Sequence, residues 1–453
     1  MKKIGLSLIS CCIGIALHAQ SNPIIKSWLQ NTTGIMGRHY ASGSSTPITD
    51  AVLANTQSVK YSGTSVYIAC TGIPAYITGP FLDGNPSLAT DQKAIFKFPL
   101  NPTKNTGTPT NTTGGNIGVF INGVALFDYR DGVSWNTASS KLCGGPIMPP
   151  CMGDGIWNRD AVVAEKMGFD CAKGHPAKGN YHHHQNPSAF NLDKLVLSNV
   201  CDLYLADGLY VIDSTKHAPL IGFAYDGFPI YGAYAYKNVD GTGGITRMKS
   251  SYSLRSITTR TTYADGSTVS AGPPVSTTYP LGYFREDYQY NPTSSATPDY
   301  LDEHNGRFCV TPEYPSGTYA YFCTVDQNWN SAYPYVVGPT FYGNKVATTV
   351  TSITETTTTY TPTSILEQLK DMKISLFPNP ATDLVAVQIP QVSQNNYELT
   401  LMSLDGKKLM STTLLQGSTI AYFDTRTLYN GQYLIYISNG ESSAVQKLTI
   451  SKQ

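Results

Sequence analysis

The chain has 453 residues, enough for two or three domains that each have a hydrophobic core of their own. Its 31 Lys and Arg residues balance 31 Asp and Glu residues, so no overall charge would attract nucleic acid or an anionic membrane surface. Tyr (31 residues), Gly (40) and Pro (28) are abundant, which favours short strands joined by turns over long helices.

The N-terminus predicts export. MKKIGLSLISCCIGIALHAQ places two lysines before an apolar run of about 15 residues and has a small residue, Ala19, before polar ones. We interpret residues 1–20 as a secretory signal peptide; the alternative is a lipoprotein signal that ends at Cys11. No later apolar run approaches the ~18 residues that span a bilayer, so we expect no transmembrane segment.

Seven cysteines follow the signal peptide, and an exported compartment permits disulfides. Between Cys309 and Cys323 lies VTPEYPSGTYAYF, in which two β-rich arms flank a Pro-Ser-Gly turn that would bring the two cysteines opposite each other. Spacing alone does not fix connectivity. The expected pairs are Cys309–Cys323, Cys143–Cys151 and Cys171–Cys201, which leaves Cys70 over.

The region that follows the signal peptide is expected to be mostly β, with long loops rich in Pro and Gly. SVKYSGTSVYIAC, AIFKFPL, NIGVFINGVALFDY and GTYAYFCTV are typical of strands, and DAVVAEKMG, which ends at Gly168, is the one fair helix candidate. We place an N-terminal β-rich region at 21–94 and a larger domain at 95–345. The Thr-rich stretch VATTVTSITETTTTYTPT indicates a linker at 346–370.

Five of the histidines lie within 43 residues, and three of them are adjacent in GNYHHHQNP (179–187). On an extended strand His182 and His184 would share one face about 7 Å apart, while His183 would point to the other face. Two such imidazoles and a third ligand can hold Cu(II) or Zn(II). His217 is the candidate third ligand. The alternative is a polar loop whose histidines bond to the backbone.

Asp226 in DGFPIYG stands between two apolar aromatic stretches, where a carboxylate must be paired or hydrogen-bonded. It is a weaker candidate metal ligand, or an acid or base, but Asp-Gly is also a common turn pair. GNYHHH is matched in form by GTYAYF (317–322), in which Ala320 and Phe322 stand where the first copy has His182 and His184. If the two segments form similar strands, only the first can ligate a metal.

Several of these segments resemble the YHYH family of secreted bacterial proteins. They are FINGVALFD, GNYHHHQNP, HAPLIGFAYDGFPIYGAY, LDEHNGRFCVTPEYPSGTYAYFCTVD and AYPYVVGPTFYG, which together cover about 95–345. The namesake motif maps onto Tyr181, His182, His183 and His184; this sequence departs from it at His183, where the family has Tyr. The resemblance names a domain without implying a reaction.

The last 80 or so residues alternate in hydrophobicity over six or seven short segments, with turn pairs such as Asn430-Gly431 between them. This pattern predicts a small antiparallel, Ig-like β-sandwich. LFPNPATDLVAV, LMSLDGKKLMS, DTRTLYNGQYLIYISNG and QKLTI resemble, in this order, the C-terminal sorting domain of type IX secretion cargo, at residues 371–453. The resemblance implies Sec export, translocation across the outer membrane by the type IX machinery, and a secreted or surface location.

Three functions are therefore carried forward, and the sequence leaves open whether the protein is an enzyme. The first is a surface domain that binds Cu or Zn through His182 and His184, with His217 as the third ligand. The second is a non-enzymatic surface binding module, for example for glycans, because tyrosine faces suit sugar rings. The third is a metal-dependent hydrolase or oxidase with Asp226 or Glu303 as acid or base. The sequence has no G-x-S-x-G elbow and no phosphate-binding glycine loop.

Overall fold

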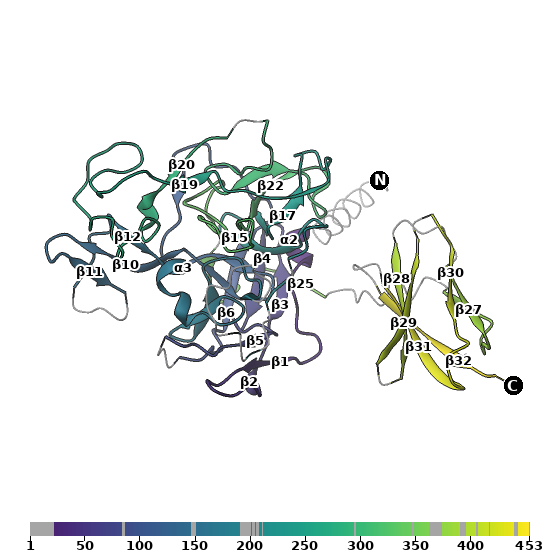
Figure 1. The fold of residues 1–453 in the computed structure, drawn as a ribbon. Helices are drawn as coiled ribbons and strands as arrows, with labels where there is room; N and C mark the ends of the chain where they lie inside the picture. Colours follow the sequence, from purple (N-terminus) through teal and green to yellow (C-terminus); the bar gives the residue numbers. More distant parts are fainter. Residues whose placement is uncertain are drawn as a thin grey trace, which may run out of the picture. The chain divides into compact units, whose positions relative to one another are not determined.

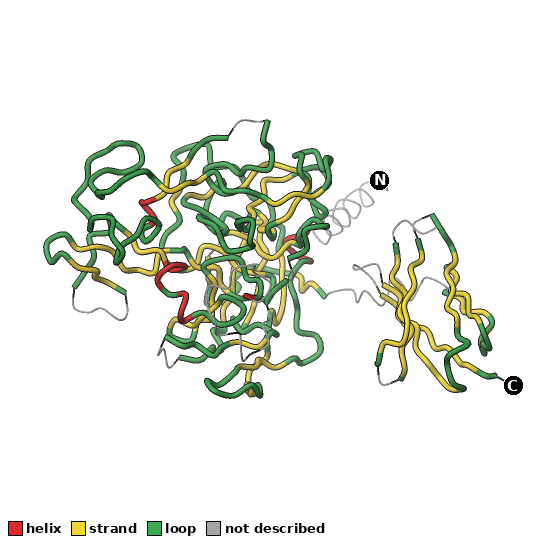
Figure 2. Tube along the Cα trace, viewed as in Figure 1, coloured by secondary structure: helices red, strands yellow, loops and turns green. Residues whose placement is uncertain are grey.

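The protein is mainly β, as its composition predicts, and divides into two compact units, residues 1–360 and 361–453. Strands and loops dominate both units (Figure 2). In the described part of the chain, no helix is long and apolar enough to cross a membrane. The predicted signal peptide, residues 1–20, lies outside that part. The computed structural model describes residues 22–83, 87–145, 151–190, 201, 204, 208–210, 212–293, 296–346, 348–361, 374–389, 396–404, 406–415, 417–438 and 443–452.

The first unit is built around a five-stranded and an eight-stranded sheet (Figure 1). Their inward faces share one large core of aliphatic and aromatic side chains, including Trp28, Phe98 and Phe223. The five-stranded sheet has the order β24-β6-β4-β3-β25. Its strands are β3 (Thr56–Tyr61), β4 (Ser65–Cys70), β6 (Ala94–Pro99), β24 (Thr348–Thr349) and β25 (Thr358–Tyr360).

This sheet includes residues on both sides of two predicted domain boundaries, the one at residue 95 and the one at the start of the Thr-rich linker. The boundary at residue 95 falls inside β6, which pairs along its whole length with β4. The first half of the predicted linker supplies β24 and β25, which pair with β6 and β3. Thr-rich segments have high β propensity, and open sheet edges offer them backbone partners, so this stretch is part of the first unit up to Tyr360.

The eight-stranded sheet has the order β13-β14-β9-β8-β15-β16-β22-β21. Each half of this order contains two antiparallel hairpins joined by one parallel contact, and the halves meet where β8 pairs antiparallel with β15. The strands are β8 (Asn116–Phe120), β9 (Ala125–Phe127), β13 (Gly174–Ala177), β14 (Asn180–His183), β15 (Leu220–Ala224), β16 (Pro229–Tyr231), β21 (Gly306–Cys309) and β22 (Thr318–Phe322).

The two halves are an internal repeat related by an approximate two-fold axis. The central register pairs Val119 with Phe223, and the neighbouring pairs are symmetric about it. IGVFINGVALF (117–127) matches IGFAYDGFPIY (221–231), and the segment that begins at Asp170 matches the one that begins at Asp302. Tyr181 donates to Asp170 at 2.8 Å in the first half, as Tyr319 donates to Asp302 at 2.8 Å in the second.

Long crossovers connect the two hairpins in each half and carry the smaller elements. The predicted helix is present as α3 (Ala161–Ala164) followed by the 3₁₀ turn η1 (Lys166–Gly168); Asp160 caps it by accepting from the N–H of Val162. The remaining elements of this unit are α2 (Pro23–Lys26), β1 (Met36–His39), β2 (Ile48–Leu53), β5 (Ile77–Thr78), β7 (Thr110–Asn111), β10 (Arg130–Asn136), β11 (Lys141–Gly144), β12 (Asn158–Asp160), β17 (Tyr234–Tyr236), β18 (Ile245–Arg247), β19 (Tyr252–Leu254), η4 (Arg285–Asp287), β20 (Tyr288–Tyr290) and β23 (Thr340–Phe341).

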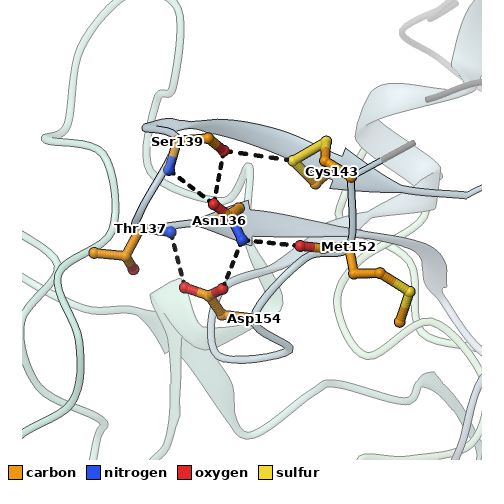
Figure 3. Close-up of a disulfide and its surroundings, with 7 residues drawn as sticks. Asn136, Thr137, Ser139, Cys143, Met152 and Asp154 are labelled. Atoms are coloured by element: carbon orange, nitrogen blue, oxygen red, sulfur yellow. Dashed lines mark hydrogen bonds between the residues drawn. A yellow bond between two sulfur atoms is a disulfide. The ribbon is translucent and has the colours of Figure 1, made fainter. Parts of the chain in front are cut away.

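Two of the three predicted disulfides are confirmed. Cys143–Cys151 and Cys171–Cys201 have Cα–Cα separations of 5.2 and 5.5 Å, within the usual range for a disulfide. Beside the first, Asn136 donates to the carbonyl of Met152 and to Asp154, and so ties the hairpin of β10 and β11 to the segment after the bridge (Figure 3).

The predicted Cys309–Cys323 pair is wrong, because both thiols are free and buried, as is Cys70. The register of β21 and β22 places Cys309 opposite Thr318. Cys323 lies five residues further along the chain, about 17 Å at the rise of a strand, and on the opposite face of the sheet. The connection between β21 and β22, residues 310–317, is therefore centred between Glu313 and Tyr314, and the Pro-Ser-Gly segment lies at its C-terminal end.

The C-terminal unit has a three-stranded sheet, β26-β27-β30, and a four-stranded sheet, β29-β28-β31-β32. All pairings within them are antiparallel, and one core that includes Val385, Leu399 and Ile435 draws side chains from both sheets. This agrees with the predicted β-sandwich. The strands are β26 (Ser375–Phe377), β27 (Leu384–Gln388), β28 (Tyr397–Ser403), β29 (Lys408–Leu414), β30 (Ile420–Asp424), β31 (Gly431–Ser438) and β32 (Ser443–Ile450).

Candidate metal centre

Three histidines of the first repeat converge at the end of the β13–β14 hairpin. His182 on β14 lies directly opposite His175 on β13, and His184 follows two residues after His182, on the same face. Their Nε2 atoms are close: His182 to His184 is 3.1 Å and His175 to His184 is 3.4 Å. Among the described residues, these three form the group of His, Cys, Asp and Glu side chains whose ligand atoms lie near enough to share one metal ion.

Glu165, the residue that ends α3, adds an oxygen to the same cluster. Its Oε2 lies 3.3 Å from Nε2 of His175 and 3.4 Å from Nε2 of His184. Burial alone would raise the pKa of the Glu165 carboxyl, but hydrogen bonds from these two histidines outweigh it and hold the pKa below its usual range. A carboxylate therefore faces the three imidazoles at the end of a crossover helix.

Backbone carbonyls fix the orientation of two of the rings. Nδ1 of His182 lies 2.8 Å from the carbonyl oxygen of Asn180, and Nδ1 of His184 lies 2.6 Å from that of Asp128. A carbonyl can only accept, so each Nδ1 carries the hydrogen, and in a neutral ring Nε2 presents its lone pair to the cluster. Such carbonyl partners are typical of metal-binding histidines.

Aromatic rings pack against the buried histidines of the cluster. The Phe127 ring stacks on His182 with centroids 3.8 Å apart, and Phe169 meets His175 edge-on at 4.9 Å. Burial and the neighbouring imidazoles hold the pKa of His182 well below its usual value. For His184 burial acts in the same direction, but contact with Glu165 outweighs it and raises the pKa.

The donor atoms around His184 have separations close to those that a tetrahedral ion requires. Metal–nitrogen bonds of 2.0–2.1 Å in a regular tetrahedron place two donors about 3.3–3.4 Å apart, whereas neighbouring donors in a square plane are about 2.9 Å apart. His184 lies 3.1 Å from His182, 3.4 Å from His175 and 3.4 Å from Glu165, and His175 lies 3.3 Å from Glu165. The three histidine atoms all lie within 4.8 Å of one another, and Glu165 contacts two of them. Three imidazoles and a neighbouring carboxylate fit Zn(II) or Cu(II) in their chemistry.

The family model described as YHYH protein matches residues 95–334, which is more than half of the chain. The chain belongs to the YHYH family. A second model, the secretion system C-terminal sorting domain, matches residues 375–451. This type IX sorting domain indicates handling by the type IX secretion machinery and secretion to the cell surface or beyond. The search of curated proteins found no match.

The four positions of the YHYH motif have different environments. Tyr181 is a framework residue that bonds to Asp170, and His182 and His184 point into the donor cluster. His183 points to the other face, where its Nε2 lies 2.7 Å from the hydroxyl of Tyr76, and burial lowers its pKa to about 3. The departure from the family pattern at His183 therefore lies outside the cluster.

The structure does not bring His217 close to His182 and His184. His217 precedes β15 in the second repeat, where its ring packs against Tyr231 and Tyr236 at 5.2 and 4.8 Å. Its Nδ1 lies 2.8 Å from the carbonyl oxygen of Ala218, and burial lowers its pKa to about 4. The third imidazole beside His182 and His184 is therefore that of His175, and not that of His217 as expected from the sequence.

Asp226 also lies in the second repeat, in the β15–β16 turn. It accepts hydrogen bonds from the hydroxyl of Tyr321 at 2.6 Å and from the N–H groups of Gly343 and Phe228, and burial raises its pKa to about 6. Asn122 makes the equivalent turn contact in the first repeat. These contacts correspond to the turn interpretation of Asp226.

Glu303, the other acid or base candidate, has a half-exposed side chain and makes a 3.6 Å ion pair with His304. It follows Asp302 at the start of the second hairpin of the second repeat, so neither Asp226 nor Glu303 belongs to the donor cluster.

His175 was missed as a member of the histidine cluster, although a signal for it was present. Lys178 and Gly179 both have positive φ (51° and 85°), which is the geometry of a two-residue hairpin turn. A Lys-Gly turn at this position pairs Ala177 with Asn180. Two residues further along each strand, it places His175 opposite His182. Glu165 had no such signal, because it comes from a crossover whose path local sequence does not determine.

Proposed function

We propose that this YHYH protein is an exported metal-binding protein whose YHYH domain holds one transition-metal ion at His175, His182 and His184, with Glu165 as the fourth ligand. The observation that carries the proposal is the convergence of three buried imidazoles whose ligand atoms lie within 4.8 Å of one another, with the Glu165 carboxylate 3.3–3.4 Å from two of them. Without a metal ion, the Nε2 atoms of His182 and His184, 3.1 Å apart in a buried site, need a shared proton between them.

The second repeat supports the proposal as an internal comparison. It keeps the framework of Asp, Gly and Tyr, but Arg307, Ala320 and Phe322 stand at the positions of His175, His182 and His184. The Arg307 guanidinium lies over the Phe322 ring at 5.6 Å, so this half fills the same place with a cation–π contact. A hairpin of this design therefore folds without histidines, which implies that those of the first repeat serve another purpose.

Four protein donors favour retention of the metal over catalysis, because catalytic zinc sites keep one position open for water or substrate. The spacing also favours Zn(II) over Cu(II), since tetragonal Cu(II) brings neighbouring donors closer together. We therefore infer a site that stores, buffers or is stabilised by Zn(II) at the cell surface.

The test is the metal content of the full exported chain, purified without a tag, reconstituted with Zn(II) and measured by inductively coupled plasma mass spectrometry. The informative variant is His182→Ala/His184→Phe, because the second repeat carries these residues at the equivalent positions of a folded hairpin. His217→Gln is the matched control, a histidine removed outside the cluster. We expect one ion per chain in the wild type and the control, and below about a tenth of that in the double variant.

Two outcomes would refute the proposal. One is a wild-type chain that retains no transition metal after reconstitution; the other is a double variant that keeps its metal. Loss of metal in His217→Gln alone would instead return His217 to the ligand set.

Substitution with Co(II) then tests the coordination geometry, because tetrahedral Co(II) absorbs visible light far more strongly than octahedral Co(II). Glu165→Gln should weaken that absorption.

A further inference from the structure

A second candidate site lies in the crossover of the second repeat. It is a cleft of about 490 Å³ between the β19–β20 ribbon, the 3₁₀ turn η4 and the segment around Tyr333. Small-molecule sites in proteins have volumes of roughly 300–1,000 Å³. Tyr252, Tyr263, Tyr288 and Tyr290 line it together with Arg130 and Arg285. Nothing in the proposed metal function uses this cleft.

Arg285 is the residue of the cleft with unused binding capacity. Its side chain is only 18 % exposed, and its Nε lies 3.3 Å from Oε1 of Glu286, longer than a charge-assisted hydrogen bond. Asn158 already donates to both oxygens of Glu286, at 2.7 and 2.8 Å. Among the described residues no acceptor binds the Nη atoms of Arg285, whose guanidinium lies 5.9 Å from the centre of the Tyr129 ring.

Other buried arginines nearby are fully engaged, which makes Arg285 an exception. Arg260 forms a two-point ion pair with Asp287 and donates to three backbone carbonyls. Arg255 donates to the carbonyls of Thr262, Tyr263 and Glu286. A partly buried guanidinium without acceptors has lost much of its hydration, and a planar carboxylate that accepts two N–H groups is the partner that best restores it.

The tyrosines define the rest of the ligand. Tyr288 stacks on Tyr333 with centroids 4.0 Å apart, and Tyr252 meets Tyr290 at 5.4 Å, so the rings form a rigid wall. Aromatic faces pack against the C–H faces of sugar rings, and phenol hydroxyls and the amides of Asn111 and Gln289 can bond to sugar hydroxyls. We propose that the cleft binds a carboxylated saccharide of one or two rings, with Arg285 holding the carboxylate and the tyrosine wall packing against the sugar.

The experiment uses the full exported chain in the presence of a chelator, so that its result does not depend on metal. The probes are the disaccharides of galacturonate, mannuronate and glucuronate, each beside its methyl ester, which has the same shape without the charge. Binding is measured by isothermal titration calorimetry. We expect at least one acid to bind saturably, and its ester to bind about ten- to a hundredfold more weakly.

Three variants separate the contributions. Arg285→Gln should remove the preference for acid over ester, and Tyr290→Ala should weaken both probes by a similar factor. Lys216→Gln removes an exposed charge elsewhere in the same unit and should change neither. An unchanged melting temperature shows that the Arg285 variant is folded. If the Arg285 variant does not fold, binding of the acid and the ester is measured in Gln289→Ala instead, a variant at the rim of the same cleft.

Several results would overturn the proposal. They are an absence of saturable binding to all three acids, equal binding of acid and ester, and unchanged binding in both the Arg285 and the Tyr290 variant. Tighter binding of a carboxylated phenol such as 4-hydroxyphenylacetate than of any uronate would overturn the assignment to sugars.

Discussion

The hydroxyls of Tyr181 and Tyr319 provide a matched pair of perturbations for the internal repeat. Each tyrosine is fully buried and donates to an aspartate that also accepts backbone N–H groups, Asp170 in the first repeat and Asp302 in the second. Replacing either Tyr by Phe removes one hydrogen bond to a carboxyl group and leaves the ring in place. We expect each variant to lose about 1–3 kcal/mol of stability.

The strands β14 and β22 are five positions apart in the sheet, about 24 Å at the usual strand spacing. The two losses should therefore add in the double variant to within about 0.5 kcal/mol. The stability is measured by calorimetry of the full chain, from the unfolding transition of the first unit. A chelator is present, so that metal binding does not contribute to the result. With metal supplied, both Tyr181→Phe and Tyr319→Phe should keep the metal content of the wild type.

Two results would refute this reasoning. If Tyr319→Phe cost nothing while Tyr181→Phe cost several kcal/mol, the two segments would not be equivalent frameworks. If Tyr181→Phe lost its metal, the first Tyr of the motif would act at the metal site and not through the hairpin.

Three further predictions concern the same unit. The pKa of His217 falls from 6.5 to about 4 on folding, so its contribution to stability is complete above pH 6.5 and is lost as the pH falls towards 4. His217→Phe should reduce the acid-induced loss of unfolding free energy by at most about 3 kcal/mol, measured as a smaller drop in melting temperature between pH 6.5 and 4, and an unchanged drop would contradict this reasoning. A Cβ at Gly174 or Gly306 would lie 2.4 Å from the hydroxyl of Tyr181 or Tyr319, so each Gly→Ala variant should lose about 1–3 kcal/mol in chemical denaturation, and a neutral variant would show that the hairpin can shift. Cys309 and Cys323 should react with a thiol reagent only after unfolding; no reaction in the unfolded chain would indicate a disulfide between them.

Local patterns in the sequence predicted the parts of the site that depend on strand geometry. Alternation along β14 was sufficient to place His182 and His184 on one face and His183 on the other, and the structure has this arrangement. The third and fourth donors depend on longer connections. A hairpin turn brings His175 across from His182, and a crossover of about 40 residues brings Glu165 to them, so only the first of these could be read from the sequence.

The differences between expectation and structure have a similar origin. The Cys309–Cys323 prediction assumed a turn centred between the two cysteines, whereas the register places Cys309 opposite Thr318. Residues 348–360 lack hydrophobic periodicity and were interpreted as linker, but an edge strand needs only backbone partners. The internal repeat was recognised only at GNYHHH and GTYAYF, although IGVFINGVALF and IGFAYDGFPIY are the stronger match.

The repeat also indicates what the histidines cost the fold. In the second half, Ala320 and Phe322 fill their places with apolar contacts that need no partner. In the first half, buried imidazoles take these places. One buried nitrogen at the equivalent position of each half has no hydrogen-bond partner among the described residues, Nδ1 of His175 in the first and Nε of Arg307 in the second. Each such atom costs about 1–3 kcal/mol, so these two costs offset each other. The buried imidazoles of His182 and His184 then make the metal-free hairpin the less stable one, because the second half has apolar side chains at these positions. A structural zinc ion contributes about 10–16 kcal/mol of binding free energy in small zinc domains, enough to reverse that order. The same residues would thus weaken the empty hairpin and make the loaded one the stronger half of the sheet.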